Sequence, residues 1–307
     1  MHDLLRRYGG GLTGAFVLLT GFWLVVLVIL PNIYLFENSF RPYLPLVDMG
    51  GPKDVYSLDN YRKVFNGTAP ETLFGIAFTL PVHVKSFLLT VGYSAYVTLI
   101  SFVIAYPIAF YLAKIVHPRT LPLLFLLLFV PLWVSEVLRS FAWAIILALT
   151  GPLNYILLGT GIIEQPIRWI AGYRSIVIGL VYTYVLFMLF PVYNAIQSLD
   201  TNQIEAAEDM GSPWWRTHWR IVLPHAKPGI ASGAVMVFML SAGSLLVPTL
   251  LGSTTSNWFT QVIQEWMFGS QDWNTGSAYA FILLVMCTIF VSLVMRIFRV
   301  KLSDIAK

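Results

Sequence analysis

The stretch Ile204–Pro228, IEAAEDMGSPWWRTHWRIVLPHAKP, decides the fold prediction, because it is the most polar part of an otherwise very apolar chain. Asp200 and Thr201, just before it, can cap the start of a helix. A short helix can then run from Gln203 to Met210. With the residues that follow, this segment predicts a helix–turn–helix between two membrane spans, and we call residues 199–227 the elbow.

A turn and a second helix complete the predicted elbow. Gly211 fits the left-handed position that ends a helix, where a residue without Cβ is favoured. Ser212 can cap the next helix, with Pro213 at its first position, where the missing N–H costs nothing. That helix is predicted over Trp214–Val222, until the two prolines that follow interrupt it.

The second helix of the elbow allows two interpretations. Arg216 and Arg220 lie four residues apart on one side, and another side is aromatic and apolar. One interpretation is a platform on which a cytoplasmic protein docks. The other is a surface helix in the lipid headgroups, with tryptophan at the interface and arginine outside it. The aromatic and apolar side consists of Trp214, Trp215, His218, Trp219 and Val222.

The spacing in the elbow resembles the EAA signature, E-A-A-x3-G-x9-I-x-L-P, of permease subunits of binding-protein-dependent ABC importers. The resemblance implies the type I importer permease fold. It also implies that the elbow is the coupling helix region, which sits in a groove of the ATPase subunit. Small residues fit this role because they let another surface approach closely. The matching residues are Glu205, Ala206, Ala207, Gly211, Ile221, Leu223 and Pro224.

The composition of the chain is that of a polytopic membrane protein. Of the 307 residues, 57% are apolar and 11% are charged, against about a quarter charged in soluble domains. The mean hydropathy is +0.74. Basic residues at membrane ends account for the net charge of +4, so nucleic acid is not a predicted partner. The single cysteine, Cys287, excludes an intrachain disulfide and any multi-cysteine metal site.

Apolar runs long enough to cross a bilayer predict an all-α fold with about six transmembrane helices in one permease domain, residues 12–307. The first run is too long for a typical signal-peptide core and lacks a clear cleavage site, so we expect it to be retained. The loop at 37–85 is expected to form a cap, not a separate domain. The runs are 12–36, 86–114, 120–149, 174–198, 228–251 and 276–300.

Basic residues set the predicted orientation. Lys and Arg gather in the N-terminal segment 1–11, after the second span, in the elbow and near the C-terminus, and are missing from 252–276. The positive-inside rule therefore places both termini and the elbow in the cytoplasm. We expect a multi-pass protein of the bacterial inner membrane whose 37–85 loop faces the periplasm.

Prolines at 107, 131, 191 and 248 lie inside predicted spans, where each removes a backbone hydrogen bond and bends or breaks its helix. One alternative is that these kinks serve packing only. The other is a moving pathway, because bent helices create a central cavity and supply hinges.

The third predicted span holds the sharpest polar feature. Glu136 and Arg139 lie three residues apart on one helix face, and ionisable groups at membrane depth usually face the interior of a bundle. They can neutralise each other as an ion pair, or they can line the translocation path or its gate. The candidate pathway residues are Trp133, Ser135, Glu136, Arg139 and Pro248.

Looser motifs resemble the spermidine/putrescine-type permeases within this family. The pattern P-x-W-x-S-x-x-x-R-x-x-A-W begins at Pro131, and Asn154 to Gly161 resembles the N-x-L-L-x-x-x-G loop. Pro248–Gly252 resembles P-x-L-L-G-G, with Ser253 in place of the second glycine. The resemblance implies a small organic cation such as a polyamine, or another small polar metabolite, as the solute.

The family resemblance also implies the partners: an ABC ATPase dimer, a second permease and an extracytoplasmic solute-binding protein. The chain has no phosphate-binding G-x4-G-K-[ST] loop, so we do not expect it to be an enzyme. ATP and Mg are expected on the ATPase, and no cofactor or metal on this chain. An alternative is a secondary transporter driven by an ion gradient, although Glu136 is its only obvious intramembrane acid. A membrane receptor or scaffold is a third class, which leaves the proline-broken spans unexplained.

Overall fold

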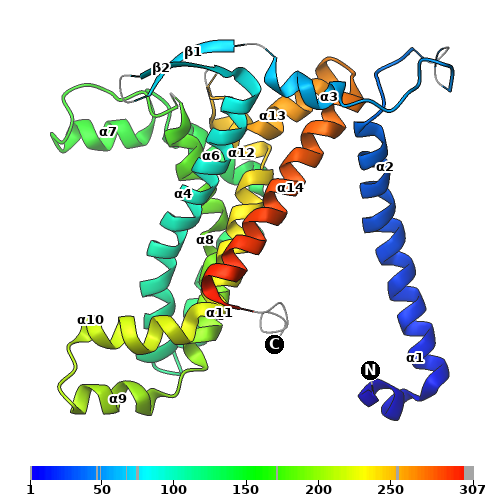
Figure 1. Cartoon of the computed structure of the whole chain (residues 1–307). Coiled ribbons are helices and arrows are strands. Elements are labelled where there is room, and N and C mark those ends of the chain that lie inside the picture. The colour runs from blue at the N-terminus through cyan, green and yellow to red at the C-terminus, as the bar shows by residue number, and fades with distance from the viewer. Residues whose placement is uncertain are drawn as a thin grey trace. The chain divides into compact units, whose positions relative to one another are not determined.

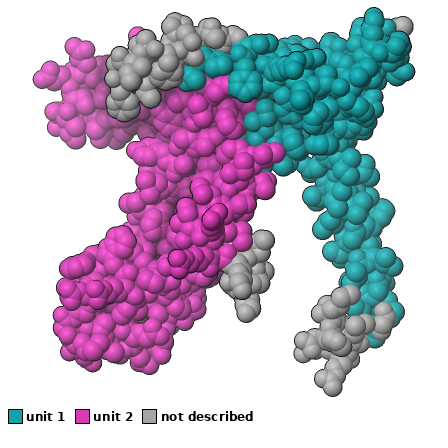
Figure 2. Space-filling model, viewed as in Figure 1, with its two compact units in different colours: residues 1–82, 263–284 teal, residues 83–262, 285–307 magenta. Residues whose placement is uncertain are grey.

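The structure, a computed structural model, describes residues 2–45, 48, 50–66, 68–73, 76–170, 172–253 and 256–300. The chain forms two compact units, coloured separately in Figure 2. Unit 1 consists of residues 1–82 and 263–284, and unit 2 consists of residues 83–262 and 285–307.

Unit 1 begins with a long helical segment that is kinked at Gly9, where φ is 74° and ψ is 162°, and Figure 1 labels its elements. The segment comprises α1 (His2–Leu24), the π-helical η1 (Val25–Ile29) and α2 (Leu30–Ser39). After it come α3 (Asp59–Arg62), the short 3-10 helix η2 (Lys63–Phe65) and the strands β1 (Thr68–Leu73) and β2 (Ile76–Pro81). The strands pair antiparallel from Thr68 opposite Pro81 to Leu73 opposite Ile76. Unit 1 also holds η5 (Glu265–Gly269) and the first part of α14 (Trp273–Phe298).

Unit 2 contains the remaining helices, which Figure 1 also labels. In chain order they are α4 (Val82–Phe110), η3 (Tyr111–Ile115), α5 (Leu121–Trp133), α6 (Glu136–Ile146), α7 (Pro152–Gly159), α8 (Tyr173–Gln197), α9 (Thr201–Asp209), α10 (Trp214–Thr217), η4 (His218–Val222), α11 (Leu223–Gly243), α12 (Leu246–Leu251) and α13 (Phe259–Gln264). The elbow helices α9 and α10 lie at one end of this unit, and α6, α7 and α12 lie at the other.

Within the described residues, five helical stretches are long and apolar enough to span a bilayer. A sixth span results if α5 and α6, which are bent by 87°, count as one. This confirms the predicted all-α class with about six membrane helices. The hairpin β1–β2 was not predicted. The five stretches are Gly11–Ser39, Val82–Ile115, Tyr173–Gln197, Trp214–Gly243 and Trp273–Phe298.

The helix bounds differ from the predicted runs at two places. The predicted run 120–149 is broken at Val134 and Ser135, whose backbones are extended, with ψ of 132° and 144°. The predicted run 228–251 corresponds to two helices. The first begins at Trp214 and ends at Gly243, and the second, α12, follows after a break at Ser244 and Leu245. Both breaks interrupt the helical hydrogen bonds inside a span.

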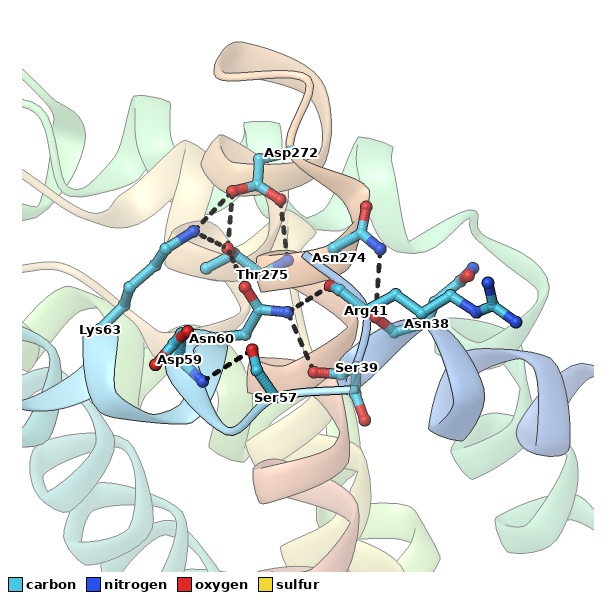
Figure 3. A network of polar contacts seen from close by, with 10 residues as sticks. All are labelled: Asn38, Ser39, Arg41, Ser57, Asp59, Asn60, Lys63, Asp272, Asn274 and Thr275. Carbon is cyan, nitrogen blue, oxygen red and sulfur yellow. Dashed lines mark hydrogen bonds and ion pairs between the residues drawn. The ribbon is translucent and has the colours of Figure 1, made fainter. Parts of the chain in front are cut away.

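Unit 1 is held together by a polar network at the start of α14, shown in Figure 3. Asp272 caps this helix, because its Oδ1 accepts the Thr275 N–H at 2.9 Å. Its Oδ2 accepts from the Thr275 hydroxyl at 2.6 Å and from Lys63 Nζ at 2.9 Å. The network continues through Asn60, whose amide nitrogen donates to the carbonyl oxygens of Ser39 and Arg41. The backbones of Ser39 and Arg41, through Asn60, and the Lys63 side chain are thereby linked to the first turn of α14.

In unit 2, α8 and α11 form the most extensive contact between two described elements. Two glycines of α11, four residues apart, permit the close approach, as small residues do between membrane helices. A Cβ on Gly229 would collide with the carbonyl oxygen of Pro191, and a Cβ on Gly233 would lie 2.7 Å from Met188 Sδ. Apolar side chains of α4, α8, α11 and α12 form one buried core around this contact.

Candidate functional site

The first helix of the elbow is capped at both ends as its sequence predicts. Asp200 Oδ1 accepts the N–H of Asn202 at 3.0 Å, which satisfies one free donor of the first turn. Gly211 has a φ of +74°, so the predicted left-handed residue is confirmed. The Gly211 N–H donates to Glu208 O at 2.8 Å and the Ser212 N–H to Ala207 O at 2.9 Å. These two bonds form a Schellman motif, which fixes the direction of the chain after α9.

The second helix of the elbow begins at Trp214, as predicted, but its cap residue differs from the prediction. Pro213 is the cap residue and Trp214 the first helical residue, so Ser212 does not cap this helix. The predicted interruption at Pro224 and Pro228 is wrong, because the helix continues without a break from Trp214 to Gly243.

A π turn explains why Pro224 does not end this helix. Proline in a helix collides with the carbonyl group four residues before it. Here that carbonyl belongs to Arg220, within the π-helical segment His218–Val222, where the Leu223 N–H donates to His218 O. The widened turn separates the backbone groups that would clash, so elbow and span form one helix.

The EAA residues of the elbow separate into a buried and an exposed set. Ala207 is buried beside Ile204, which belongs to the core of unit 2. Ile221 and Leu223 are half-buried and pack on the same core. The exposed set is Glu205, Ala206, Gly211 and Pro224.

Large side chains around the exposed EAA residues form an aromatic surface. Trp214, Trp215, Trp219 and Met210 are between 56% and 83% exposed. His218 and Val222, predicted to share this surface, are buried instead. The elbow therefore exposes three tryptophans, one methionine and the carboxylate of Glu205, and the Arg216 guanidinium lies 5.5 Å from the centre of the Trp215 ring.

A second polar site lies at the break between α5 and α6. The Tyr184 hydroxyl donates to Glu136 Oε1 at 2.9 Å. Tyr184 is the twelfth of the 25 residues of α8, so this site lies near the middle of a membrane span. Ser135 caps α6 by accepting the Leu138 N–H at 3.4 Å.

The structure does not bring Glu136 and Arg139 together as an ion pair. No ion pair within 4.0 Å links them among the described residues, and Arg139 Nε is buried there without a hydrogen-bond partner. Trp133, at the end of α5, is 76% exposed, whereas Pro248 is buried in α12, which packs on α6. Among the predicted pathway residues, Glu136 and Ser135 are thus the two whose side chains have an assigned hydrogen bond.

Sequence reasoning missed Tyr184 and the contacts of His218. The signal for Tyr184 is weak, because it is one tyrosine in an apolar span and its partner lies 48 residues away. His218 was assigned to the aromatic surface, but its ring faces α4, where Tyr106 Oη lies 2.6 Å from His218 Nδ1.

Comparison with known proteins identifies the class to which this fold and this elbow belong. Residues 71–303 match the family described as "Binding-protein-dependent transport system inner membrane component". The chain belongs to this family and is a multi-pass permease, the transport subunit of an ABC importer. This favours the importer over the alternative of an ion-gradient-driven transporter.

The predicted resemblance to spermidine/putrescine-type permeases is also confirmed. The chain is 33% identical to the spermidine/putrescine transport system permease protein PotB of Escherichia coli (strain K12), over 86% of this chain and 89% of that protein. It is 32% identical to PotB of Salmonella typhimurium (strain SL1344), over 92% and 94% of the two chains.

Solved structures share the fold at low sequence identity. The crystal structure of a bacterial ABC transporter that imports the acidic polysaccharide alginate has a chain with a TM-score of 0.71 and 17% identity, covering 97% of both chains. The same transporter in complex with an alginate pentasaccharide-bound periplasmic protein gives a TM-score of 0.72.

Proposed function

We propose that this permease forms, with a homologous sister permease, an alternating-access pathway for a small polar organic cation of the polyamine type. A solute-binding protein delivers the solute from outside. The identity to two PotB proteins, which are spermidine/putrescine permeases by name, supports this solute class. One chain of about six helices is too narrow to enclose a pathway, which supports a second permease.

The observation that carries the proposal is the exposed surface of the elbow. An ABC ATPase dimer docks there, contacting Glu205 and Ala206 and the tryptophans beside them, while Ala207, Ile221 and Leu223 hold the surface on the core. Aromatic side chains and a nearby charge are typical of the energetically important residues of protein interfaces. Gly211 sets the angle between the two helices, and Pro224 lies at the exposed edge. ATP and Mg are bound by the ATPase and not by this chain.

The orientation follows from this docking. The elbow, the N-terminal segment and the C-terminus lie in the cytoplasm, and the segment 37–85 lies outside. ATP binding shifts the population of the importer between outward-open and inward-open states, because the ATPase binds the two states unequally.

The mid-span site is the proposed contact with the solute. Glu136, held by Tyr184, supplies a negative charge near the middle of the span, with Ser135, Arg139, Trp133 and Pro248 around the two helix breaks. A carboxylate at this depth is costly unless a partner or a cationic solute compensates it.

The test is reconstitution of the chain with the proposed partners, an ATPase, a sister permease and a solute-binding protein from the same organism. We expect uptake of radiolabelled putrescine or spermidine into proteoliposomes to require ATP and to persist with a protonophore. Uptake without ATP, or uptake that collapses with the protonophore at constant ATP, would contradict the importer mechanism. Uptake of a different solute by the complete complex would contradict only the polyamine assignment.

A further inference from the structure

The buried side of the elbow is attached to α4 by a histidine that no sequence motif includes. His218 is 6% exposed, and its Nδ1 lies 2.6 Å from the Tyr106 hydroxyl. Its ring lies between Phe110 of α4 and Trp214 of the elbow, with centroid distances of 4.4 Å to each. Thus His218 joins the exposed aromatic surface to a membrane span by one hydrogen bond and two ring contacts.

A second attachment joins α4 to the other end of the elbow. Lys114 Nζ donates to the carbonyl oxygen of Leu199 and, at 3.5 Å, to that of Gln197. These carbonyls lie at the end of α8 and the start of the elbow. Tyr106 and Lys114 are eight residues apart, or about 12 Å along a helix at 1.5 Å per residue. Two attachments at this separation prevent the elbow from pivoting on α4 about a single contact.

The segment of α4 between the attachments is irregular. Pro107 follows Tyr106 directly, and the π-helical η3, Tyr111–Ile115, contains Lys114. Proline and π turns are the usual places where helices bend. Beyond this segment, α4 has a buried row of hydroxyl side chains at helical spacing: Ser86, Thr90, Ser94, Thr98 and Ser101. A displacement of the elbow would therefore move α4, the span whose buried face carries these hydroxyl groups.

We propose that Tyr106 and His218 are positioning residues that transmit the movement of the docked ATPase from the elbow to α4. This inference rests on the proposed docking of the ATPase at the elbow. The hydrogen bond and the ring contacts make α4 move with the elbow, while Lys114 holds the opposite side. The buried face of the elbow thus transmits the movement, whereas the EAA residues Glu205 and Ala206 lie on the exposed face that contacts the ATPase.

The experiment measures the movement of α4 in the assembled importer in lipid nanodiscs. Cys287 is the only cysteine, so one change to alanine gives a background for site-directed spin labelling. Labels at Val103→Cys on α4 and Leu293→Cys on α14 are placed at positions that are 62% and 52% exposed in the chain. Electron–electron double resonance then gives the distance between them with and without ATP and Mg, in the presence of vanadate.

Tyr106→Phe removes only the hydroxyl, and we expect it to reduce the nucleotide-dependent distance change at least to half. His218→Leu removes this hydrogen bond and the ring contacts with Phe110 and Trp214, so it should reduce the distance change at least as much. Adding Tyr106→Phe to His218→Leu should cause no further loss, because the hydrogen bond is already absent. His218→Asn, which keeps a polar atom near the position of Nδ1, should restore part of the change. Tyr111→Phe is the matched control, since Tyr111 is 51% exposed on the adjacent turn, and should behave as the wild type.

Retention of the ATPase on the affinity-purified complex separates the possible failures. If the wild-type complex does not retain the ATPase, the docking proposal and this inference fall together. If the wild type retains it and Tyr106→Phe shows the full distance change at equal ATPase retention, only this inference is overturned. Additive effects of the two substitutions would also overturn it, because they would mean that the residues act separately.

Discussion

The Tyr184 hydroxyl of α8 donates a 2.9 Å hydrogen bond to Oε1 of Glu136, the first residue of α6 after its break from α5. This bond joins two helices near the middle of a span, and it gives Glu136 a neutral partner in place of Arg139. The proposed pathway therefore contains a carboxyl group that has no ion-pair partner among the described residues.

The first prediction concerns this charge. Glu136→Gln keeps an acceptor for Tyr184 but removes the charge, and we expect the rate of polyamine uptake to fall about tenfold or more, equivalent to roughly 1.4 kcal/mol. Tyr184→Phe should lower the stability of the chain by about 1 kcal/mol, typical of a hydrogen bond between membrane helices. Uptake in proteoliposomes and thermal unfolding in detergent measure the two effects.

Exchanging the charges of Glu136 and Arg139 tests whether these two residues have only a structural role. Because Glu136 and Arg139 do not form an ion pair, Glu136→Arg with Arg139→Glu should not restore uptake. Wild-type uptake by the swapped protein would mean that the two charges only neutralise each other and that neither contacts the solute.

The second prediction concerns the turn of the elbow. Gly211 has a φ of +74° and open space around its missing Cβ, so a substitution there meets conformational strain and no clash. We expect Gly211→Asn to be tolerated, Gly211→Ala to cost about 1 kcal/mol, and Gly211→Val to cost more, because a β-branched residue resists positive φ. ATPase retention should fall in the same order. Equal retention by all three variants would exclude a role for the turn in docking.

The third prediction concerns the contact of α8 with α11. Gly229→Ala places a Cβ against the Pro191 carbonyl oxygen, and overpacking of this kind costs about 1–3 kcal/mol. Gly92→Ala on α4 is the matched control, because nothing lies within 4 Å of its missing Cβ. Thermal unfolding of the purified chain compares them, and an unchanged unfolding temperature for Gly229→Ala would contradict the packing described here.

The fourth prediction concerns pH and the network of unit 1. Burial by itself would raise the pKa of Asp272, but hydrogen bonds from Thr275 and the ion pair with Lys63 lower it below the ordinary value of 3.8. A lowered pKa stabilises the folded state fully above that ordinary value, and the contribution is lost as the pH falls through the folded pKa. The network should therefore be insensitive to pH near neutrality and weaken only below about pH 4.

Hydrogen exchange of the Thr275 amide, which donates to Asp272, reports on this network. Asp272→Asn should accelerate the exchange about tenfold, corresponding to a loss of roughly 1.4 kcal/mol. Asp59→Asn is the control, because the Asp59 carboxylate is 67% exposed and its ion pair with Arg62 is at the surface. Equal protection in Asp272→Asn and the wild type would show that the carboxylate does not hold the helix start.

Local chemistry made the elbow predictable. A capping aspartate, a left-handed glycine and a fixed spacing of small residues act within a few residues of one another, so Asp200 and Gly211 could be assigned from the sequence. The continuous helix beyond Pro224 could not be predicted, because the π turn that accommodates the proline has no marker in the sequence.

Contacts between distant segments were the ones that could not be predicted. Glu136 and Arg139 share a helix face, which favoured an ion pair, but tertiary packing placed Tyr184 closer to the carboxylate. In the same way, the hairpin of residues 68–81 depends on pairing between two segments with little strand pattern. The interior position of His218 follows from the approach of α4, which a helical wheel of the elbow alone does not contain.

The unbroken helix from Trp214 to Gly243 has a mechanical consequence. Figure 1 shows this helix changing direction between the elbow and the membrane-spanning part of α11, and the π turn His218–Val222 and Pro228 lie in this region. Because the main chain stays helical through the bend, no loop separates the tryptophans from the span that ends at Gly243. A displacement that a docked ATPase imposes on the tryptophans is therefore passed along one continuous helix to the second helix break, at Ser244 and Leu245.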